Sequence, residues 1–459
     1  MVNNSLPKGW RWVTLSDIAA KNYGLIDGPF GSNLPASEYI GYGIPVIRGS
    51  NLTSGDGFFN SDEFVYISPE TAQRLSRSLA YPDDIIFTKK GTLGQTGFVP
   101  HDPRFEKYLT SSNQMKLTVD RDTASPLFVY YYVSSTESRE KIKRDSESTG
   151  VPKTNLEYLR TFPISLPPLH TQHAIARILG SLDNKIELNL QMNETLEAMA
   201  RTIFQSWFVV FDPVRAKAEG RDTGLPPEVA ALFPDGFEEV AGREVPKGWG
   251  IESLGNVIEM TTGKSYTSDE LQESTTALVT LKSFQRGGGY RQDGLKPFIG
   301  KYKPEQVIRP GELVISFTDV TQAAEVIGKP AIVSANLEFQ TLVASLDVGI
   351  IRPKNERINV SFLYLLLRND DYQSFIYGYC SGTTVLHLNK LGVPKYEFIC
   401  PDPEIMKIFF NISKPIFDEI ENNIQQSSTL AQIRDALLPK LMSGEISISG
   451  CDIISNEGT

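Results

Sequence analysis

The sequence contains little cysteine and no long hydrophobic run. Cys380, Cys400 and Cys451 are far apart and form no Cys-x-x-Cys pair, so neither a disulfide framework nor a structural zinc site is expected. No run of 18 apolar residues occurs, and the N-terminal residues Met1-Val2-Asn3-Asn4-Ser5 do not begin a signal peptide. We therefore expect a cytoplasmic protein without a membrane partner.

Motifs that would carry catalysis are also missing. Gly263-Lys264-Ser265 is similar to the end of a phosphate-binding loop, but Ile258 stands where the first glycine is needed. No Asn/Asp-Pro-Pro-aromatic loop of an amino-methyltransferase occurs, and Pro82-Asp83-Asp84 is better explained as a turn before a strand than as a nuclease site. His170 and His173 have no third metal ligand nearby in the sequence. We expect no catalytic, cofactor-binding or metal-binding residue in this chain.

What the sequence does contain is a duplication. Leu6-Pro7-Lys8-Gly9-Trp10 returns as Val245-Pro246-Lys247-Gly248-Trp249, and each copy opens a segment of similar length that closes on a helical pattern. A duplicated unit predicts pseudo-twofold symmetry, and duplex DNA is a common partner with such symmetry.

The two helical patterns share a seam of residues spaced by seven. Adding 234 to each number of the first seam gives the second. The residues are Ile175, Leu182, Asn189, Leu196 and Ile203, and then Phe409, Ile416, Asn423, Leu430 and Leu437. Matched seams predict that the helices pack antiparallel as a coiled coil, in which a buried asparagine fixes register. A helix over residues 171–208 would span roughly 57 Å at ~1.5 Å per residue. Pro415 predicts an interruption of the second helix, with Pro439 closing it.

Each helical pattern follows a repeat that reads as rich in β-structure, which predicts an α+β fold with several domains. Strands are expected over 44–48, 84–88, 96–99 and 115–119, and again over 277–281, 312–316, 331–333 and 342–346. Amphipathic helices are expected over 126–144 and 360–377, the first followed by a turn at 148–150. Residues 213–244 read as an extended connector, with at most a short turn of helix around 227–232.

The net charge of −10 is distributed unevenly. Residues 161–244 hold 12 acidic against 7 basic residues, and 401–459 hold 9 against 4, whereas 1–160 and 245–400 are each balanced. Because DNA affinity depends on local neutralisation of phosphates, an acidic total does not exclude DNA. The residues that we expect to face DNA are polar or basic and lie in predicted loops. They are Lys89, Lys90, Thr92, Gln95, Asn113 and Gln114 in the first repeat, and Lys282, Arg286 and Arg291 in the second.

Several strings of the sequence occur together in one known family. In the first repeat they are Pro7-Lys8-Gly9-Trp10, the run from Asp84 to Gly94, and Ser111-Ser112-Asn113-Gln114. In the helical segments they are Pro167 to Ala176, Asp183-Asn184-Lys185-Ile186, Phe204 to Phe208, and Leu438 to Ile446. Together these strings resemble the specificity subunits of type I restriction-modification enzymes. The second repeat departs from the pattern: Ser316-Phe317-Thr318-Asp319 replaces the Lys-Lys-Gly-Thr loop and Phe339-Gln340-Thr341 replaces Ser-Asn-Gln.

The resemblance implies a specific organisation. It implies a first target recognition domain over 1–160, a central conserved spacer helix over 161–212 and the connector 213–244. A second target recognition domain over 245–400, a C-terminal conserved spacer helix over 401–446 and a tail over 447–459 follow. The two β-rich domains would be separated by the two long antiparallel helices.

The resemblance also implies a function without chemistry in this chain. Each recognition domain would read one half of a bipartite, asymmetric site in double-stranded DNA, and the helices would set the unspecified spacer. The helices would also dock two adenine-N6 methyltransferase subunits, and two motor-nuclease (restriction) subunits would complete the complex. S-adenosylmethionine, ATP and Mg²⁺ would then belong to the partner subunits. Two alternatives stay open: a DNA methyltransferase or nuclease with a fused recognition domain, and a paired-domain scaffold that binds protein.

Overall fold

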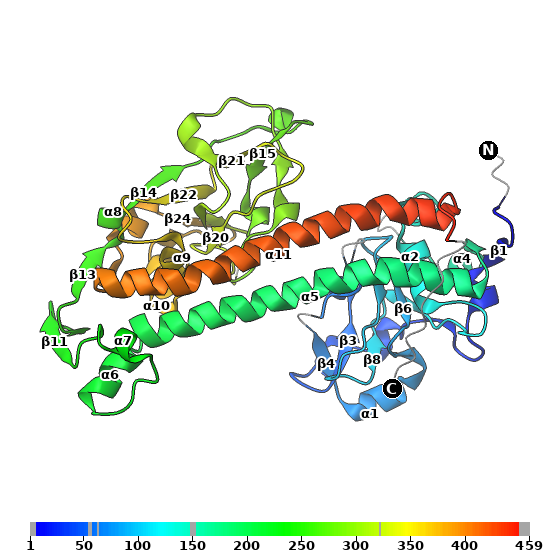
Figure 1. The fold of residues 1–459 in the computed structure, drawn as a ribbon. Coiled ribbons are helices and arrows are strands. Elements are labelled where there is room, and N and C mark those ends of the chain that lie inside the picture. Colours follow the sequence, from blue (N-terminus) through cyan, green and yellow to red (C-terminus); the bar gives the residue numbers. More distant parts are fainter. Residues whose placement is uncertain (1–5, 54–56, 62–63, 147–152, 321–322, 449–459) are drawn as a thin grey trace. The chain divides into compact units, whose positions relative to one another are not determined.

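The computed structural model describes the chain except for residues 1–5, 54–56, 62–63, 147–152, 321–322 and 449–459 (Figure 1). The expected turn at 148–150, Cys451 and most of the predicted tail therefore lie outside the described residues. The chain divides into two compact units. The first unit holds residues 1–188 and 429–459, and the second holds 189–428.

The first unit is built on two four-stranded sheets and a ribbon. One sheet is antiparallel, in the order β2 (Leu25–Asp27), β9 (Gln114–Leu117), β6 (Ile85–Thr88), β7 (Thr96–Phe98). The other has the order β4 (Val65–Ile67), β3 (Ile44–Ile47), β8 (Tyr108–Thr110), β5 (Leu79–Ala80), and its β3 and β8 run parallel. The ribbon pairs β1 (Arg11–Thr14) with β10 (Pro163–Leu166). Short helices α1 (Pro69–Arg74) and α4 (Leu156–Arg160) complete the domain.

The second unit repeats this topology strand for strand. Its antiparallel sheet has the order β14 (Ile258–Thr262), β22 (Val348–Pro353), β18 (Leu313–Ser316), β20 (Pro330–Ile332). The mixed sheet has the order β16 (Lys296–Pro297), β15 (Thr276–Val279), β21 (Thr341–Ala344), β17 (Val307–Ile308), with β15 and β21 parallel. The ribbon is β13 (Gly250–Ser253) with β25 (Glu397–Cys400), beside the short helix α8 (Leu254–Val257). An additional small sheet has the order β19 (Thr318–Asp319), β24 (Leu386–Leu388), β23 (Cys380–Ser381).

The repeated Pro-Lys-Gly-Trp string forms the same turn in both units. The amide of Trp10 donates to the carbonyl of Pro7 at 3.0 Å, and Trp249 donates to Pro246 at the same distance. The third residue of each turn has a positive φ, +87° at Gly9 and +80° at Gly248. A type II turn requires this conformation, which glycine adopts without steric cost.

Both segments expected to be helical are helical over the expected ranges, but each is divided into two helices. The first is divided into α2 (Pro126–Ser134) and α3 (Thr136–Arg144), and the second into α9 (Val360–Arg368) and α10 (Asp370–Tyr377). Ser135 and Asn369 stand at the breaks in extended conformation. Their side chains accept hydrogen bonds from backbone amides in the first turn of the next helix, those of Ser138 and Asp371. Ser135 and Asn369 are strong N-cap residues, and they lie 234 positions apart, like the seam residues.

Two long helices pass from one unit into the other. They are α5 (Leu169–Phe208), of 40 residues, and α11 (Pro403–Ser443), of 41 residues. The predicted interruption at Pro415 and the end at Pro439 were wrong, because α11 continues through both. Pro415 and Asn411, whose carbonyl would lose its helical partner, are exposed, so water can satisfy that carbonyl. All ten seam residues are buried or half-buried.

The connector is more structured than expected. It contains α6 (Asp212–Ala218), α7 (Pro227–Ala230) and a hairpin of β11 (Phe237–Val240) with β12 (Arg243–Pro246). Pro213 stands in the first turn of α6, where its missing amide costs nothing. The expected short turn near 227–232 corresponds to α7.

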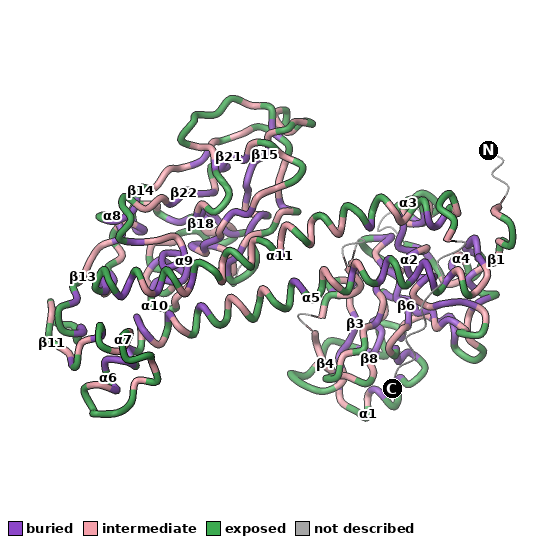
Figure 2. The backbone as a smooth tube through the Cα atoms, viewed as in Figure 1, coloured by how far each residue is buried: buried purple, intermediate pink, exposed green. Residues whose placement is uncertain are grey.

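The core of each unit lies between its sheets and its part of the long helices. Figure 2 shows buried residues concentrated in the strands and in α2 and α9. In the first unit, Phe128 and Ile175 share a cluster with Leu441. In the second, Phe204, Phe362 and Phe409 pack edge to face. The α+β class, with duplicated β-rich domains and two long helices, is confirmed.

Candidate nucleic-acid interface

A polar cleft of about 520 Å³ opens where three loops of the first unit meet. The loops follow β3, follow β6 and precede β9, the inner strands of the two sheets. The lining residues are Tyr39, Arg48, Gly49, Ser50, Thr88, Lys90, Gly91, Thr92, Gln95, Ser111, Ser112, Asn113 and Gln114. Among these described residues two are basic and none is acidic, so the cleft attracts anions.

Five of the six residues expected to face DNA in the first repeat line this cleft. Lys90, Thr92 and Asn113 are exposed, Gln95 is half-buried, and Gln114 is buried. Side-chain amides beside hydroxyls and a cation are suited to reading base edges and holding phosphate. Contact of these residues with DNA stays a prediction.

Lys89 lies outside the cleft lining. Its ammonium group pairs with the Asp27 carboxylate at 2.8 Å, and its amide donates to the carbonyl of Asn113 at 2.7 Å. Lys89 thus ties the loop after β6 to the turn before β9, and it positions the cleft instead of lining it.

Gln114 is held in place by its own turn. The hydroxyl of Ser111 donates to Oε1 of Gln114, and the amide of Gln114 donates to the carbonyl of Ser111 at 3.1 Å. The turn packs against Gly28 so closely that a Cβ there would lie 2.0 Å from the carbonyl oxygen of Ser111. These contacts fix the carboxamide of Gln114 in the lining of the cleft.

Sequence reasoning missed Arg48 as a cleft residue. Arg48 directly follows the buried strand β3, and its amide donates to Oδ1 of Asn51 at 2.9 Å. A charged residue at the end of a fully apolar run was the available signal. Lys153 was also missed; it forms a β-bridge with Lys90 at the edge of the cleft.

Asp84 belongs to a buried structural network. Its carboxylate accepts from the amide of Tyr81 at 2.8 Å and from the Thr118 hydroxyl, and lies 3.3 Å from the ammonium of Lys116. Burial raises the pKa of the Asp84 carboxyl, although the charge of Lys116 opposes this rise. These contacts fit the interpretation of Pro82-Asp83-Asp84 as a turn before a strand.

Backbone hydrogen bonds identify the equivalent loops of the second unit. Lys89 donates to Asn113 in the first unit, and Phe317 donates to Asp347 in the second, both at 2.7 Å. Strand register likewise pairs Thr88 with Gln114 and Ser316 with Val348. The turn equivalent to Ser111–Gln114 is therefore 345–348, and the proposed correspondence with Phe339-Gln340-Thr341 was wrong.

The equivalent loops carry different chemistry. Thr280 and Thr318 stand at the places of Arg48 and Lys90, and Asp347 and Val348 at those of Asn113 and Gln114. The Thr318 hydroxyl donates to the Asp347 carboxylate at 2.7 Å. Lys390 places its ammonium 4.8 Å from the centre of the Phe317 ring, and it is a cation near these loops that sequence reasoning missed.

The three residues expected to face DNA in the second repeat do not gather in one cleft. Lys282 is exposed on the turn after β15. Arg286 pairs with Glu325 at 3.2 Å, and the Arg291 Nε donates to Asp293 at 3.0 Å. Neighbouring carboxylates therefore balance both arginines, and their contact with DNA stays a prediction.

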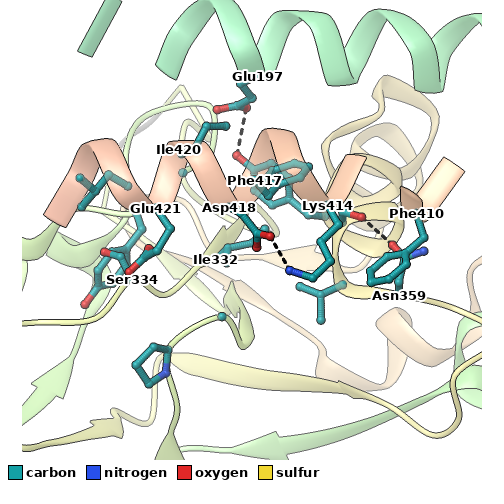
Figure 3. A pocket seen from close by; sticks show the side chains of 18 of the residues that line it. Glu197, Ile332, Ser334, Asn359, Phe410, Lys414, Phe417, Asp418, Ile420 and Glu421 are labelled. Atoms are coloured by element: carbon teal, nitrogen blue, oxygen red, sulfur yellow. Dashed lines mark hydrogen bonds and ion pairs between the residues drawn. The ribbon is translucent and has the colours of Figure 1, made fainter. Parts of the chain in front are cut away.

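The second unit also contains a groove of about 1,810 Å³ between its part of the long helices and the sheet loops. Figure 3 shows Phe410, Lys414 and Phe417 of α11 in this groove, with Glu197 pointing from α5 toward them. Within the described ranges, no helix is long and apolar enough to cross a membrane. In the same part of the chain, no three His, Cys, Asp or Glu side chains cluster as metal ligands would.

Comparison with known proteins connects this geometry to a family. Residues 7–198, which include the polar cleft, match the model of the type I restriction modification DNA specificity domain. The chain is similar to specificity subunits of type I restriction enzymes from two organisms. The type I restriction enzyme HindI specificity subunit of Haemophilus influenzae is 28% identical over 77% of this chain and 84% of its own length. The MjaIX specificity subunit of Methanocaldococcus jannaschii is 23% identical over 96% of this chain and 95% of its own.

A solved structure supports the fold. The S subunit of a type I restriction-modification system from M. genitalium has a TM-score of 0.52 and 16% identity, and the match covers 96% of this chain and 97% of that one. The family resemblance inferred from the sequence is confirmed.

Proposed function

We propose that this chain is the non-catalytic subunit that gives a type I restriction-modification enzyme its DNA sequence specificity. Each β-rich repeat reads one half of a bipartite, asymmetric site in duplex DNA. The observation that carries the proposal is that the same three loops recur in both repeats with different side chains. Arg48 and Lys90 of the first repeat are replaced by Thr280 and Thr318 in the second. Loops of equal geometry and unequal side chains suit two different half-sites.

The long helices supply the second part of the proposed function. A helix of 40 residues extends over roughly 60 Å at ~1.5 Å per residue, more than the ~34–36 Å of one DNA turn. Paired by their seams, α5 and α11 set the length of the unspecified spacer. They also dock two adenine-N6 methyltransferase subunits, and two motor-nuclease subunits join through the complex. S-adenosylmethionine, ATP and Mg²⁺ act in those partner subunits.

Replacing one repeat tests the proposal. Residues 1–160 are exchanged for the corresponding domain of a relative, and the methylated motif is read by sequencing modified bases in cells that also carry the methyltransferase partner. One half of the motif should change while the other half and the spacer stay the same. The reciprocal exchange of 245–400 should change only the other half.

Two other results would contradict the proposal, each in a different part. A replacement that alters both half-sites would contradict independent reading by the two repeats. A full-length chain that binds no duplex at low salt, alone or with its methyltransferase partner, would favour a protein-binding scaffold instead.

A further inference from the structure

A buried polar network joins the two long helices in the first unit. Arg434 of α11 donates to Asp183 of α5 at 2.7 Å, and the hydroxyl of Tyr131 from α2 donates to the other oxygen of Asp183 at 2.5 Å. The side chains of Arg434 and Asp183 are only 7% and 5% exposed. Burial raises the pKa of the Tyr131 hydroxyl, and the charge of Asp183 raises it further.

The equivalent positions in the second unit are apolar. The seam offset of 234 relates Asp183 to Phe417, Tyr131 to Leu365, and Arg434 to Ala200. Ala200 and Leu365 are buried in the hydrophobic core of that unit, and Phe417 packs against it. The same helix positions thus carry an ion pair in one unit and an apolar contact in the other.

The second unit has an ionic contact at other positions. Glu197 of α5 pairs with Arg368 of α9 and accepts from the hydroxyl of Tyr364 at 3.0 Å. By the same offset, the first unit has Ala431 and Ser134 in place of Glu197 and Arg368. In both units the acid comes from the N-terminal half of the chain and the arginine from the C-terminal half.

The central asparagine layer, in contrast, is reciprocal. The amide of Asn189 donates to the hydroxyl of Ser427 at 3.1 Å, and the amide of Asn423 donates to Oδ1 of Asn193 at 2.9 Å. These two contacts are exchanged by the offset of 234. The asparagine layer distinguishes the two halves less than the ion pairs do, although Asn189 also donates to Gln426 at 2.9 Å and Met192 stands at the equivalent of Gln426.

We infer that the two ion pairs make the association of the two halves heterotypic, so that the N-terminal half pairs with a C-terminal half and not with a second copy of itself. In a pair of N-terminal halves, Ala200 of the other copy would face Asp183 and leave its carboxylate buried without a cation. In a pair of C-terminal halves, Arg434 would face Phe417, and Arg368 would face Ala431. Removing one partner of a buried ion pair is strongly destabilising. The inference goes beyond the proposed function and does not depend on DNA.

The test uses the complete chain, cut after folding. A protease site is placed at the exposed turn 220–224, and isotopically labelled and unlabelled preparations are cleaved, mixed, unfolded in urea and refolded together. Native mass spectrometry then counts the pairs. The ratio of heterotypic to homotypic pairs should exceed its statistical value at least 100-fold, which corresponds to about 2.8 kcal/mol at ~1.4 kcal/mol per factor of ten. A statistical mixture of like and unlike pairs would overturn the inference.

A variant should weaken the preference. Tyr131→Leu, Asp183→Phe and Arg434→Ala together give the first unit the side chains found at the equivalent positions of the second. The excess of heterotypic pairs should fall at least tenfold, because only the contact between Glu197 and Arg368 still discriminates. An undiminished excess would contradict the assignment. Lys414→Ala, which removes an exposed ion pair within α11, is the matched control and should change nothing.

A second measurement covers the case in which the triple variant does not fold. Asp183→Ala, Arg434→Ala and the double variant are compared by urea unfolding of the uncut chain. If the buried pair is coupled, the double variant loses less stability than the sum of the two single variants. Strictly additive losses would overturn the inference.

Discussion

At the scale of single residues, substitution of Arg48 and Lys90 tests whether the polar cleft of the first unit binds DNA. Both line the cleft, and no acidic residue accompanies them among its described lining residues. If each contacts a phosphate, Arg48→Ala and Lys90→Ala should each weaken binding to all sequences and lower the salt slope by about one unit. Fluorescence anisotropy with duplex DNA across a salt series measures both effects.

Arg104→Ala provides a control of equal charge. Arg104 is exposed on the loop between β7 and β8, which leaves the strand ends opposite the cleft, and it pairs with Asp102. Its removal should leave the salt slope unchanged. If Arg48→Ala and Lys90→Ala behave like Arg104→Ala, the DNA face lies elsewhere on the domain.

The asparagine layer makes a prediction about stability. Oδ1 of Asn189 is buried without a hydrogen-bond partner among the described residues. Replacing Asn189 and Asn423 with leucine should raise the free energy of unfolding by about 1–2 kcal/mol, because well-packed apolar side chains often outperform buried polar ones. It should also loosen register, because a buried asparagine in a coiled-coil seam selects one alignment.

Urea unfolding measures the first effect, and the appearance of a second spacer length in the methylated motif reports the second. Asn184→Leu with Asn422→Leu makes the same chemical change at exposed positions of the same helices. This control should change neither the free energy of unfolding nor the spacer length. A loss of stability in the Asn189/Asn423 variant would show that the layer contributes more than register.

At the scale of elements, residue periodicity predicted where helices and strands lie, whereas the breaks between helices at capping residues were not predicted. The seam and the strand positions followed from spacing, since apolar repeats of seven and short β-branched runs are set by which face is buried. The breaks at Ser135 and Asn369 were missed because the amphipathic pattern continues across them while the cap residue starts a new helix. At Pro415 the error was the opposite one, because a break was predicted where the helix continues. An exposed proline is tolerated in a helix whose residues also pack into two hydrophobic cores.

The site was predictable only where its residues share a local string. The loop from Lys89 to Gln95 was recognised by its glycines, and the turn at Ser111–Gln114 by its amides. In the second repeat, the turn 345–348 was missed because its residues differ from those of the first. The seam offset of 234 does relate Ser111–Gln114 to 345–348, but only strand register and backbone hydrogen bonds show that the two turns are structurally equivalent.

The length of the paired helices should determine the spacer. Four residues inserted between Leu182 and Asn189, and four more in the facing stretch between Asn423 and Leu430, would keep the helices paired. The insertion advances the helix by ~6 Å and rotates it ~40° beyond a full turn. One base pair advances DNA by ~3.4 Å and rotates it by roughly 35°. The spacer should therefore grow by one or two base pairs while both half-sites stay the same.

Sequencing of modified bases in cells that express the insertion variant and its methyltransferase partner reads both quantities. A synonymous change of the Lys185 codon, within the first insertion site, serves as the expression control. An unchanged spacer, with methylation retained, would show that something other than α5 and α11 sets the distance.

At the scale of the whole molecule, the duplication accounts for the asymmetric site in the proposed function. The topology of the sheets is the same in both units, whereas the loop chemistry differs, as do the buried contacts with the long helices. In the proposed function, the shared topology presents the same loops in both repeats, and their different side chains select different half-sites.

The most direct test of this account is methylation itself. The purified chain, incubated with duplex DNA and S-adenosylmethionine, should transfer no methyl group. With its methyltransferase partner, it should direct N6-adenine methylation to one bipartite motif, and that motif should disappear when the chain is omitted. Methyl transfer by the chain alone, or a motif that persists without it, would contradict the central claim that this protein provides specificity and not catalysis.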